Sequence, residues 1–149
     1  MSPNPPPTAA SSALCHPSEL VDAALRLAGS SLRHLTRVER YVDADALVGP
    51  LPRPRLLGLL STLLAYSSER LTAPLPARAR WLRVEASAED GALRLAVEDG
   101  ARDPPRGQDL ALLAEAVRRL GGTLEVCTGE NRGTQFLVRL APASLVAVA

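Results

Sequence analysis

The stretch that decides the fold is GGTLEVCTGENRGTQFLVRL, residues 121–140. Gly121 and Gly122 follow a helical pattern, where glycine supplies the left-handed conformation that ends a helix. The runs on either side of Gly133 alternate apolar or β-branched residues with polar ones, which is typical of strands with one buried face. A glycine-containing turn between two such runs predicts a β-hairpin. The stretch therefore predicts a helix that leads into the last two strands of a sheet.

With Thr134 and Phe136 directly after Gly133, this stretch resembles the closing hairpin of the histidine-kinase ATP-binding domain. That domain belongs to the GHKL superfamily, also called the Bergerat-fold ATPases. The resemblance extends over nearly everything after residue 17. It implies an α/β (α+β) two-layer sandwich, a Bergerat-type ATP-binding fold with one mixed β-sheet and the helices on a single face.

The rest of the chain offers the elements that this fold requires, in the same order. We expect helices at residues 18–35 and 55–71, a strand at 36–43, and a hairpin of 81–86 with 93–98 that turns at Asp90 and Gly91. The first helix would begin at a Ser18 cap and bury a stripe of Leu20, Ala24, Leu27 and Leu32. The second would bury a stripe of Leu56, Leu59, Leu60, Leu63 and Leu64.

The strand at residues 93–100 ends in Asp99 and Gly100. The resemblance implies that Asp99 accepts a hydrogen bond from the amino group of adenine. It also implies that Gly107, Gly133 and Thr134 belong to the nucleotide-binding positions. Taken alone, an Asp-Gly pair is more often a turn than a ligand site.

The helix at residues 55–71 resembles the family's asparagine-box helix, but its chemical positions differ. In that register Thr62 stands at the position of the polar residue that orients water or acts as a base. Tyr66 stands at the position of the asparagine that coordinates magnesium. A phenol is a poor substitute for an amide oxygen on magnesium, and a threonine cannot accept a proton near neutral pH. We therefore expect neither a catalytic residue nor a metal site.

The glycine-rich turns of the family are altered as well. Ala101 and Asp103 stand near the first turn, where both glycines are displaced, and Asp109 occupies a glycine position of the second turn. A carboxylate at a helix N-terminus caps the helix but repels an anionic phosphate. Binding of ATP or ADP is therefore expected to be weak at most.

Length and charge restrict the remaining possibilities. The 149 residues suffice for one domain with a substantial core. We expect a disordered Pro/Ser/Ala-rich tail at 1–17, the ATPase-like domain at 18–142 and a short tail at 143–149.

A net charge of +1 argues against nucleic acid as a partner. No apolar run is long enough to span a membrane, so a cytoplasmic location is expected. Cys15 and Cys127 show no disulfide or metal spacing.

Two functional interpretations remain open. Neither His16 nor His34 lies in the acidic pair and helical hairpin that a phospho-accepting histidine would need, and His34 is better suited to capping helix carbonyls. The favoured interpretation is a bacterial pseudo-kinase, a protein-binding module in two-component signalling. Its partner would be a receiver domain, a kinase helical hairpin or a sigma-factor-like protein. The alternative is a divergent but working ATP-binding domain of a histidine kinase or anti-sigma-type serine kinase, acting in trans.

Overall fold

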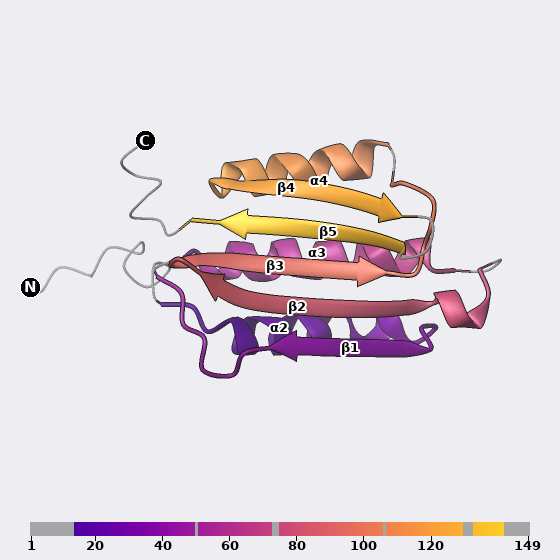
Figure 1. The fold of residues 1–149 in the computed structure, drawn as a ribbon, viewed down its shortest axis with the longest axis horizontal. Helices are drawn as coiled ribbons and strands as arrows, with labels where there is room; N and C mark the ends of the chain where they lie inside the picture. Colours follow the sequence, from indigo (N-terminus) through magenta and orange to yellow (C-terminus); the bar gives the residue numbers. More distant parts are fainter. Residues whose placement is uncertain (1–13, 50, 73–74, 106, 130–132, 142–149) are drawn as a thin grey trace, which may run out of the picture.

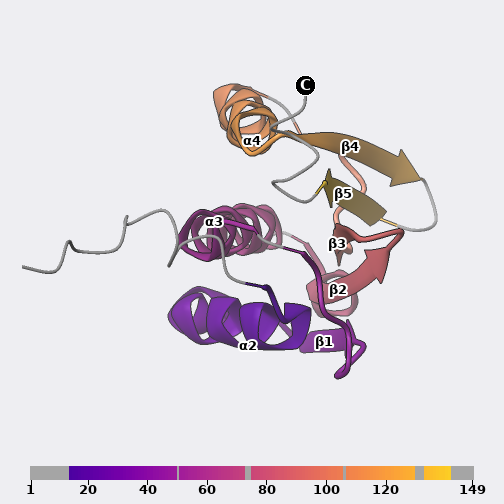
Figure 2. The same ribbon diagram turned by 90° about the vertical axis from the view of Figure 1, so that its left-hand side faces the viewer.

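The computed structural model describes residues 14–49, 51–72, 75–105, 107–129 and 133–141. Five strands form one mixed sheet in the order β1-β2-β3-β5-β4, and the helices cover one of its faces (Figures 1 and 2). The strands are β1 (Arg37–Val42), β2 (Trp81–Glu89), β3 (Ala92–Asp99), β4 (Gly122–Gly129) and β5 (Gly133–Leu140). The predicted two-layer sandwich is confirmed.

Strand pairing follows the predicted hairpins. The β2–β3 hairpin turns at Asp90 and Gly91, which both have positive φ, and β4 pairs antiparallel with β5. β5 lies between β3 and β4, whereas β1 pairs parallel with β2 at one edge. This register sets Asp99 opposite Thr134 at the end of the central strand pair.

The helical layer contains α2 (Pro17–Leu27), α3 (Arg53–Arg70) and α4 (Gln108–Arg119), with short 3₁₀ turns η1 (Gly29–Leu32) and η2 (Ala77–Ala79). The apolar stripe predicted for α3 is buried at all five positions, against the inner face of the sheet. Phe136 of β5 is the bulkiest fully buried side chain. Figure 2 shows α2 and α3 side by side, with α4 set apart over β4.

The first predicted helix is wrong in three details. It ends at Leu27 and continues as η1 instead of running to residue 35, because Gly29, Ser30 and Ser31 have low helix propensity. Its N-cap is His16, not Ser18, and Pro17 occupies the first turn, where proline's missing N–H costs nothing. Leu27 is 65% exposed, so it does not belong to the buried stripe.

The end of the expected N-terminal tail is already part of the fold. Cys15 is buried and exchanges backbone hydrogen bonds with Val48, and Pro17 starts α2. Residues 1–13, which make up most of that tail, lie outside the described residues, as do residues 142–149. Cys15 and Cys127 are both free thiols, and Cys127 points to solvent from β4.

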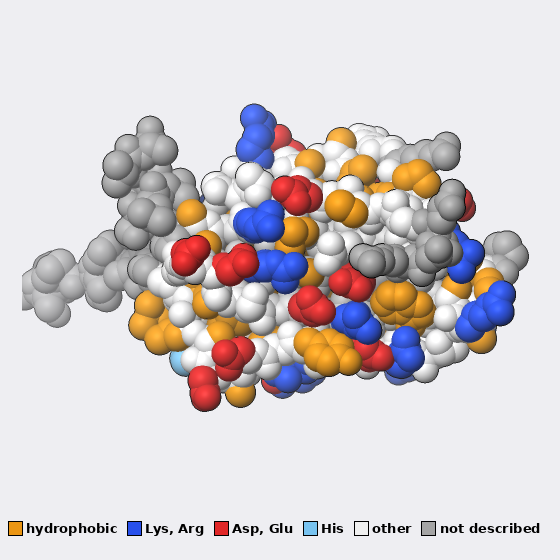
Figure 3. Space-filling view, in the orientation of Figure 1, with side chains coloured by type: hydrophobic (Ala, Val, Ile, Leu, Met, Phe, Trp, Pro, Cys, Tyr) orange, Lys and Arg blue, Asp and Glu red, His pale blue; other side chains and the backbone are white. Residues whose placement is uncertain are grey.

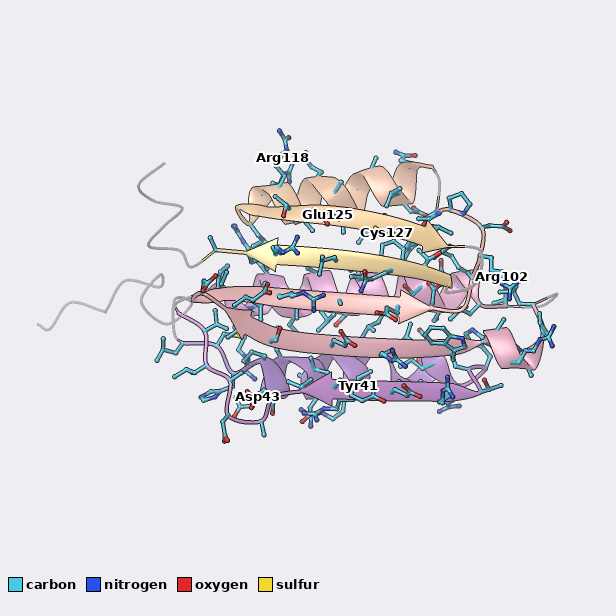
Figure 4. All side chains as sticks on the ribbon, in the orientation of Figure 1. Tyr41, Asp43, Arg102, Arg118, Glu125 and Cys127 are labelled. Carbon is cyan, nitrogen blue, oxygen red and sulfur yellow. The ribbon has the colours of Figure 1, made fainter. Side chains whose placement is uncertain are left out.

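The sheet face opposite the helices is polar. Arg83 is 3.1 Å from Glu39 and 3.7 Å from Glu98, and Arg139 is 3.5 Å from Glu125. Figure 3 shows acidic and basic side chains interspersed over this face, and Figure 4 shows Glu125 and Cys127 on β4. Exposed hydrophobic side chains, such as Tyr41 of β1, lie among these charges.

Candidate functional site: a buried carboxylate and a groove between two helices

Asp99 ends β3 and is completely buried, so its carboxylate must find partners inside the protein. The Ala101 amide donates to Oδ1 over 3.0 Å. Arg70 Nη1 donates to Oδ2 over 2.9 Å, which forms a salt bridge. Both carboxylate oxygens are thus engaged by groups of the chain itself.

Arg70 reaches this carboxylate from the last turn of α3. Its Nη2 donates to Thr134 Oγ1 over 3.2 Å and to the carbonyl oxygen of Asp103. Its guanidinium carbon lies 5.6 Å from the centroid of the Phe136 ring, which adds a cation–π contact. The Arg70 side chain is only 13% exposed. One guanidinium therefore ties the end of α3 to β3, β5 and the segment after β3.

Thr134 and Gly133 complete this cluster from β5. The buried Thr134 hydroxyl donates to the Ala101 carbonyl over 2.7 Å, so it holds the segment that leaves β3. Gly133 has φ 81°, and a Cβ at this position would collide with the backbone carbonyl oxygen of Asp99. Only glycine allows β5 to start this close to Asp99.

Burial raises the pKa of the Asp99 carboxyl to about 6. The positive charge of Arg70 and the hydrogen bond from the Ala101 amide act in the opposite direction, because both favour the ionised form. The carboxylate thus retains its charge at neutral pH through contacts with the chain's own groups.

A second feature, the α3–α4 groove, lies between those two helices. It has a volume of about 730 Å³, and its lining includes Thr62, Tyr66, Leu112, Leu113 and Leu120. Thr62 and Leu112 are exposed, whereas Tyr66 is half-buried and makes an edge-to-face contact with Phe136, at 5.9 Å between ring centroids.

The structure separates the predicted site residues into two places. Asp99, Gly133 and Thr134 lie together in the buried cluster. Thr62 and Tyr66 line the α3–α4 groove instead.

Gly107, another predicted nucleotide-binding position, is the N-cap of α4, with φ 88° and open space where a Cβ would lie. Asp109, in the first turn of α4, lines the groove. Gly107 therefore caps the start of α4, and Asp109 contributes to the α4 wall of the groove.

Arg70 was not among the predicted site residues, although it binds Asp99. A signal was present: Leu63, Ser67 and Arg70 have the i, i+4, i+7 spacing of one helix face, and the first two are buried. A charged residue on a buried helix stripe needs an opposite charge nearby. Likewise, His34 donates to a helix carbonyl as expected, but to Ser68 of α3 and not to its own helix.

Neither a protein-family model nor a curated protein sequence matches this chain. Solved structures do match it. The nucleotide-free catalytic domain of histidine kinase ThkA superposes with a TM-score of 0.71 and 14% identity, over 88% of this chain and 97% of that one.

Two further solved structures agree. The Acinetobacter baumannii histidine kinase AdeS matches with a TM-score of 0.66 and 15% identity, over 88% of this chain and 67% of that chain. A mycobacterial sensor histidine kinase, MprB, matches with a TM-score of 0.65 and 18% identity, over 88% and 99%. The chain therefore has the fold of the catalytic domains of histidine kinases.

The described residues contain no group of three or more histidine, cysteine, aspartate or glutamate side chains that could hold a metal ion. Among the same residues, no helix has the length and apolar character needed to cross a bilayer.

Proposed function

We propose that this chain is a pseudo-kinase, a domain with the histidine-kinase ATP-binding fold that acts by binding another protein and not by transferring phosphate. The observation that carries this proposal is the Arg70–Asp99 salt bridge. Arg70 and Ala101 each donate a hydrogen bond to one of the two Asp99 oxygens, and the carboxylate is completely buried, so an adenine amino group has no open approach to it. A purine would have to displace a largely buried guanidinium, which leaves two charges to be satisfied again.

The α3–α4 groove also suits magnesium triphosphate poorly. Tyr66 contributes a phenol where a hard amide oxygen would serve magnesium, and Thr62 contributes no base. Glu69 and Asp109 line the same groove with negative charge, which repels phosphates. The residues present therefore do not fit a magnesium nucleotide, and any residual binding of ATP or ADP would be weak.

The partner would belong to bacterial two-component signalling or to a related regulatory system. A receiver domain, a kinase helical hairpin and a sigma-factor-like protein are the partner classes that the fold suggests. The alternative function is a divergent but working ATP-binding domain acting in trans. The survival of Asp99, Gly133 and Thr134 as one buried cluster favours that alternative.

Calorimetric titration with ATP, ADP and adenosine, each with and without magnesium, tests the proposal. We expect weak or undetectable binding that is indifferent to magnesium. The variant Arg70→Ala should bind adenosine about tenfold more tightly than the natural chain, because it releases the Asp99 carboxylate. Adding Asp99→Asn to Arg70→Ala should remove that gain, because an amide presents a donor toward the adenine amino group.

Magnesium-dependent tight binding of ATP, ATP hydrolysis, or autophosphorylation by the purified chain would overturn the pseudo-kinase proposal and establish the alternative. An unchanged adenosine affinity in Arg70→Ala would show that Arg70 does not block the base site. Thermal unfolding of each variant, measured alongside, separates loss of the fold from loss of binding.

A further inference from the structure

The α3–α4 groove presents apolar surface to solvent on the helical side of the molecule. Leu112 of α4 is 60% exposed there, while the neighbouring Leu113 is buried in the groove floor. On α3, Gly58, Thr62 and Ala65 line the groove with small side chains at helical spacing. Leu59 and Tyr66 add larger side chains to this wall, and the small residues beside them leave room for the side-chain ridge of another helix.

The charges of the α3–α4 groove are separated between its two ends. α3 and α4 run antiparallel, because the segment after β3 leads from the end of α3, where Arg70 binds the Asp103 carbonyl, to the start of α4 (Figure 1). Glu69 and Asp109 therefore lie at one end, and Arg55 and Arg119 at the other.

At both ends of the groove, charged side chains lack a full set of oppositely charged partners among the described residues. Glu69 and Asp109 form no ion pair within the described part of the chain. Arg119 is paired with Glu115 over 3.2 Å, but Glu115 also binds Arg118, so one carboxylate serves two guanidinium groups. The groove therefore has a negative end and a positive end with apolar surface between them.

We propose, building on the proposed function, that this groove receives an amphipathic helix of a partner protein. The helix lies along α3 and α4 with its apolar stripe on Leu112 and Leu113. Its basic end lies beside Glu69 and Asp109, and its acidic end beside Arg55. The complementary charges fix its position along the groove and reject helices with the wrong charge order. α4 has 12 residues, so about 18 Å of groove holds about three turns of the bound helix.

The test uses the full 149-residue chain and two synthetic peptides of about fifteen residues, each with the same apolar stripe at helical spacing. One peptide carries its acidic residues at one end and its basic residues at the other. The second has the same composition with the charges interspersed. Fluorescence anisotropy with labelled peptides gives each Kd, and amide chemical shifts locate the binding surface. We expect the charge-separated peptide to bind about tenfold more tightly, with shifts confined to α3 and α4.

Matched variants establish which surface is responsible. Leu112→Glu should weaken binding by about tenfold or more, because it places a charge in the apolar contact. Leu27→Glu is the control, since Leu27 on α2 has nearly the same exposure, 65%, and lies outside the groove. Its Kd should equal that of the natural chain. The double variant Glu69→Lys with Asp109→Lys should abolish the preference for the charge-separated peptide.

Several results would overturn the proposal: equal affinity for both peptides, shifts on the open sheet face, or equal losses in Leu112→Glu and Leu27→Glu. Peptide binding that appears only after removal of residues 142–149 would assign the groove to the chain's own C-terminal segment. A mass that doubles with concentration and is restored to the monomer value by Leu112→Glu would assign it to a second copy. ATP turnover refutes the proposed function whatever the peptides do. Absence of peptide binding without nucleotide turnover refutes only the helix proposal.

Discussion

The two sides of the last turn of α3 differ in how their polar groups are satisfied. On the sheet side, Arg70 and Asp99 neutralise each other inside a buried cluster. On the α4 side, Glu69 remains exposed and without an ion pair among the described residues, at the rim of the α3–α4 groove. A buried cluster whose charges neutralise each other stabilises the fold. An unpaired charge beside exposed apolar surface favours the binding of a partner protein. The fold thus separates its structural polar contacts from its candidate binding surface.

The largest loss of stability should come from adding a Cβ at Gly133, beside the buried cluster. Gly133→Ala would set a Cβ against the Asp99 carbonyl and force a non-glycine residue to positive φ. We expect a loss of about 3–5 kcal/mol in unfolding free energy, from left-handed strain plus overpacking. Gly107→Ala is the matched control, with φ 88° but open space, and should lose about 1–2 kcal/mol. Denaturant unfolding measures both, and equal losses would contradict the close packing.

Removing the cation of the cluster should have the next largest effect. Arg70→Ala leaves the Asp99 carboxylate buried without its counter-charge, and at pH 7 we expect a loss of about 3 kcal/mol. The exposed Arg55, at the rim of the groove, provides the comparison, and Arg55→Ala should change stability by less than about 0.5 kcal/mol. The loss in Arg70→Ala should shrink at pH 5, where the carboxyl can accept a proton. A loss that is the same at both pH values would show that the charge of Asp99 is not involved.

The smallest of the three changes in stability is the one that Asp99 should cause as the pH rises. Asp99 has a pKa raised to about 6 in the folded protein, above its value in the unfolded chain, so the folded state holds its proton more tightly. The stability that Asp99 contributes is therefore fully present below pH 4 and is lost as the pH rises through 6. Relative to Asp99→Asn, the natural chain should lose about 2 kcal/mol between pH 4 and pH 6. Parallel stability curves for the two proteins would contradict the raised pKa.

Much of this fold could be predicted because its signals are local. The glycines and alternating residues of the β4–β5 hairpin lie within twenty consecutive positions, and Asp90 with Gly91 identifies the other hairpin. The error at Leu27 has a local cause as well. Leu27 is the last residue of α2, where Gly29 and the two serines follow, whereas the periodic stripe assumes a helix that continues to Leu32 and so places Leu27 in the core.

The candidate site could be predicted only in part, because its contacts join distant positions. Arg70 and Asp99 are 29 residues apart, and their pairing depends on how the end of α3 meets the end of β3. The separation between α3 and α4 depends on the path of the chain after Asp99. Sequence periodicity describes each helix alone and gives no distance between two helices.

The strand order has a consequence for folding. β5 follows the other four strands of the sheet in sequence, yet it lies between β3 and β4. During synthesis β4 emerges first and has no neighbour in the sheet until residues 133–140 follow it. The sheet therefore closes late, through pairings between β3 and β5 that are distant in sequence, and such non-local pairings slow folding. Until β5 arrives, the inner edge of β3 is an unpaired strand that other chains can bind, so the nascent protein should depend on protection from aggregation.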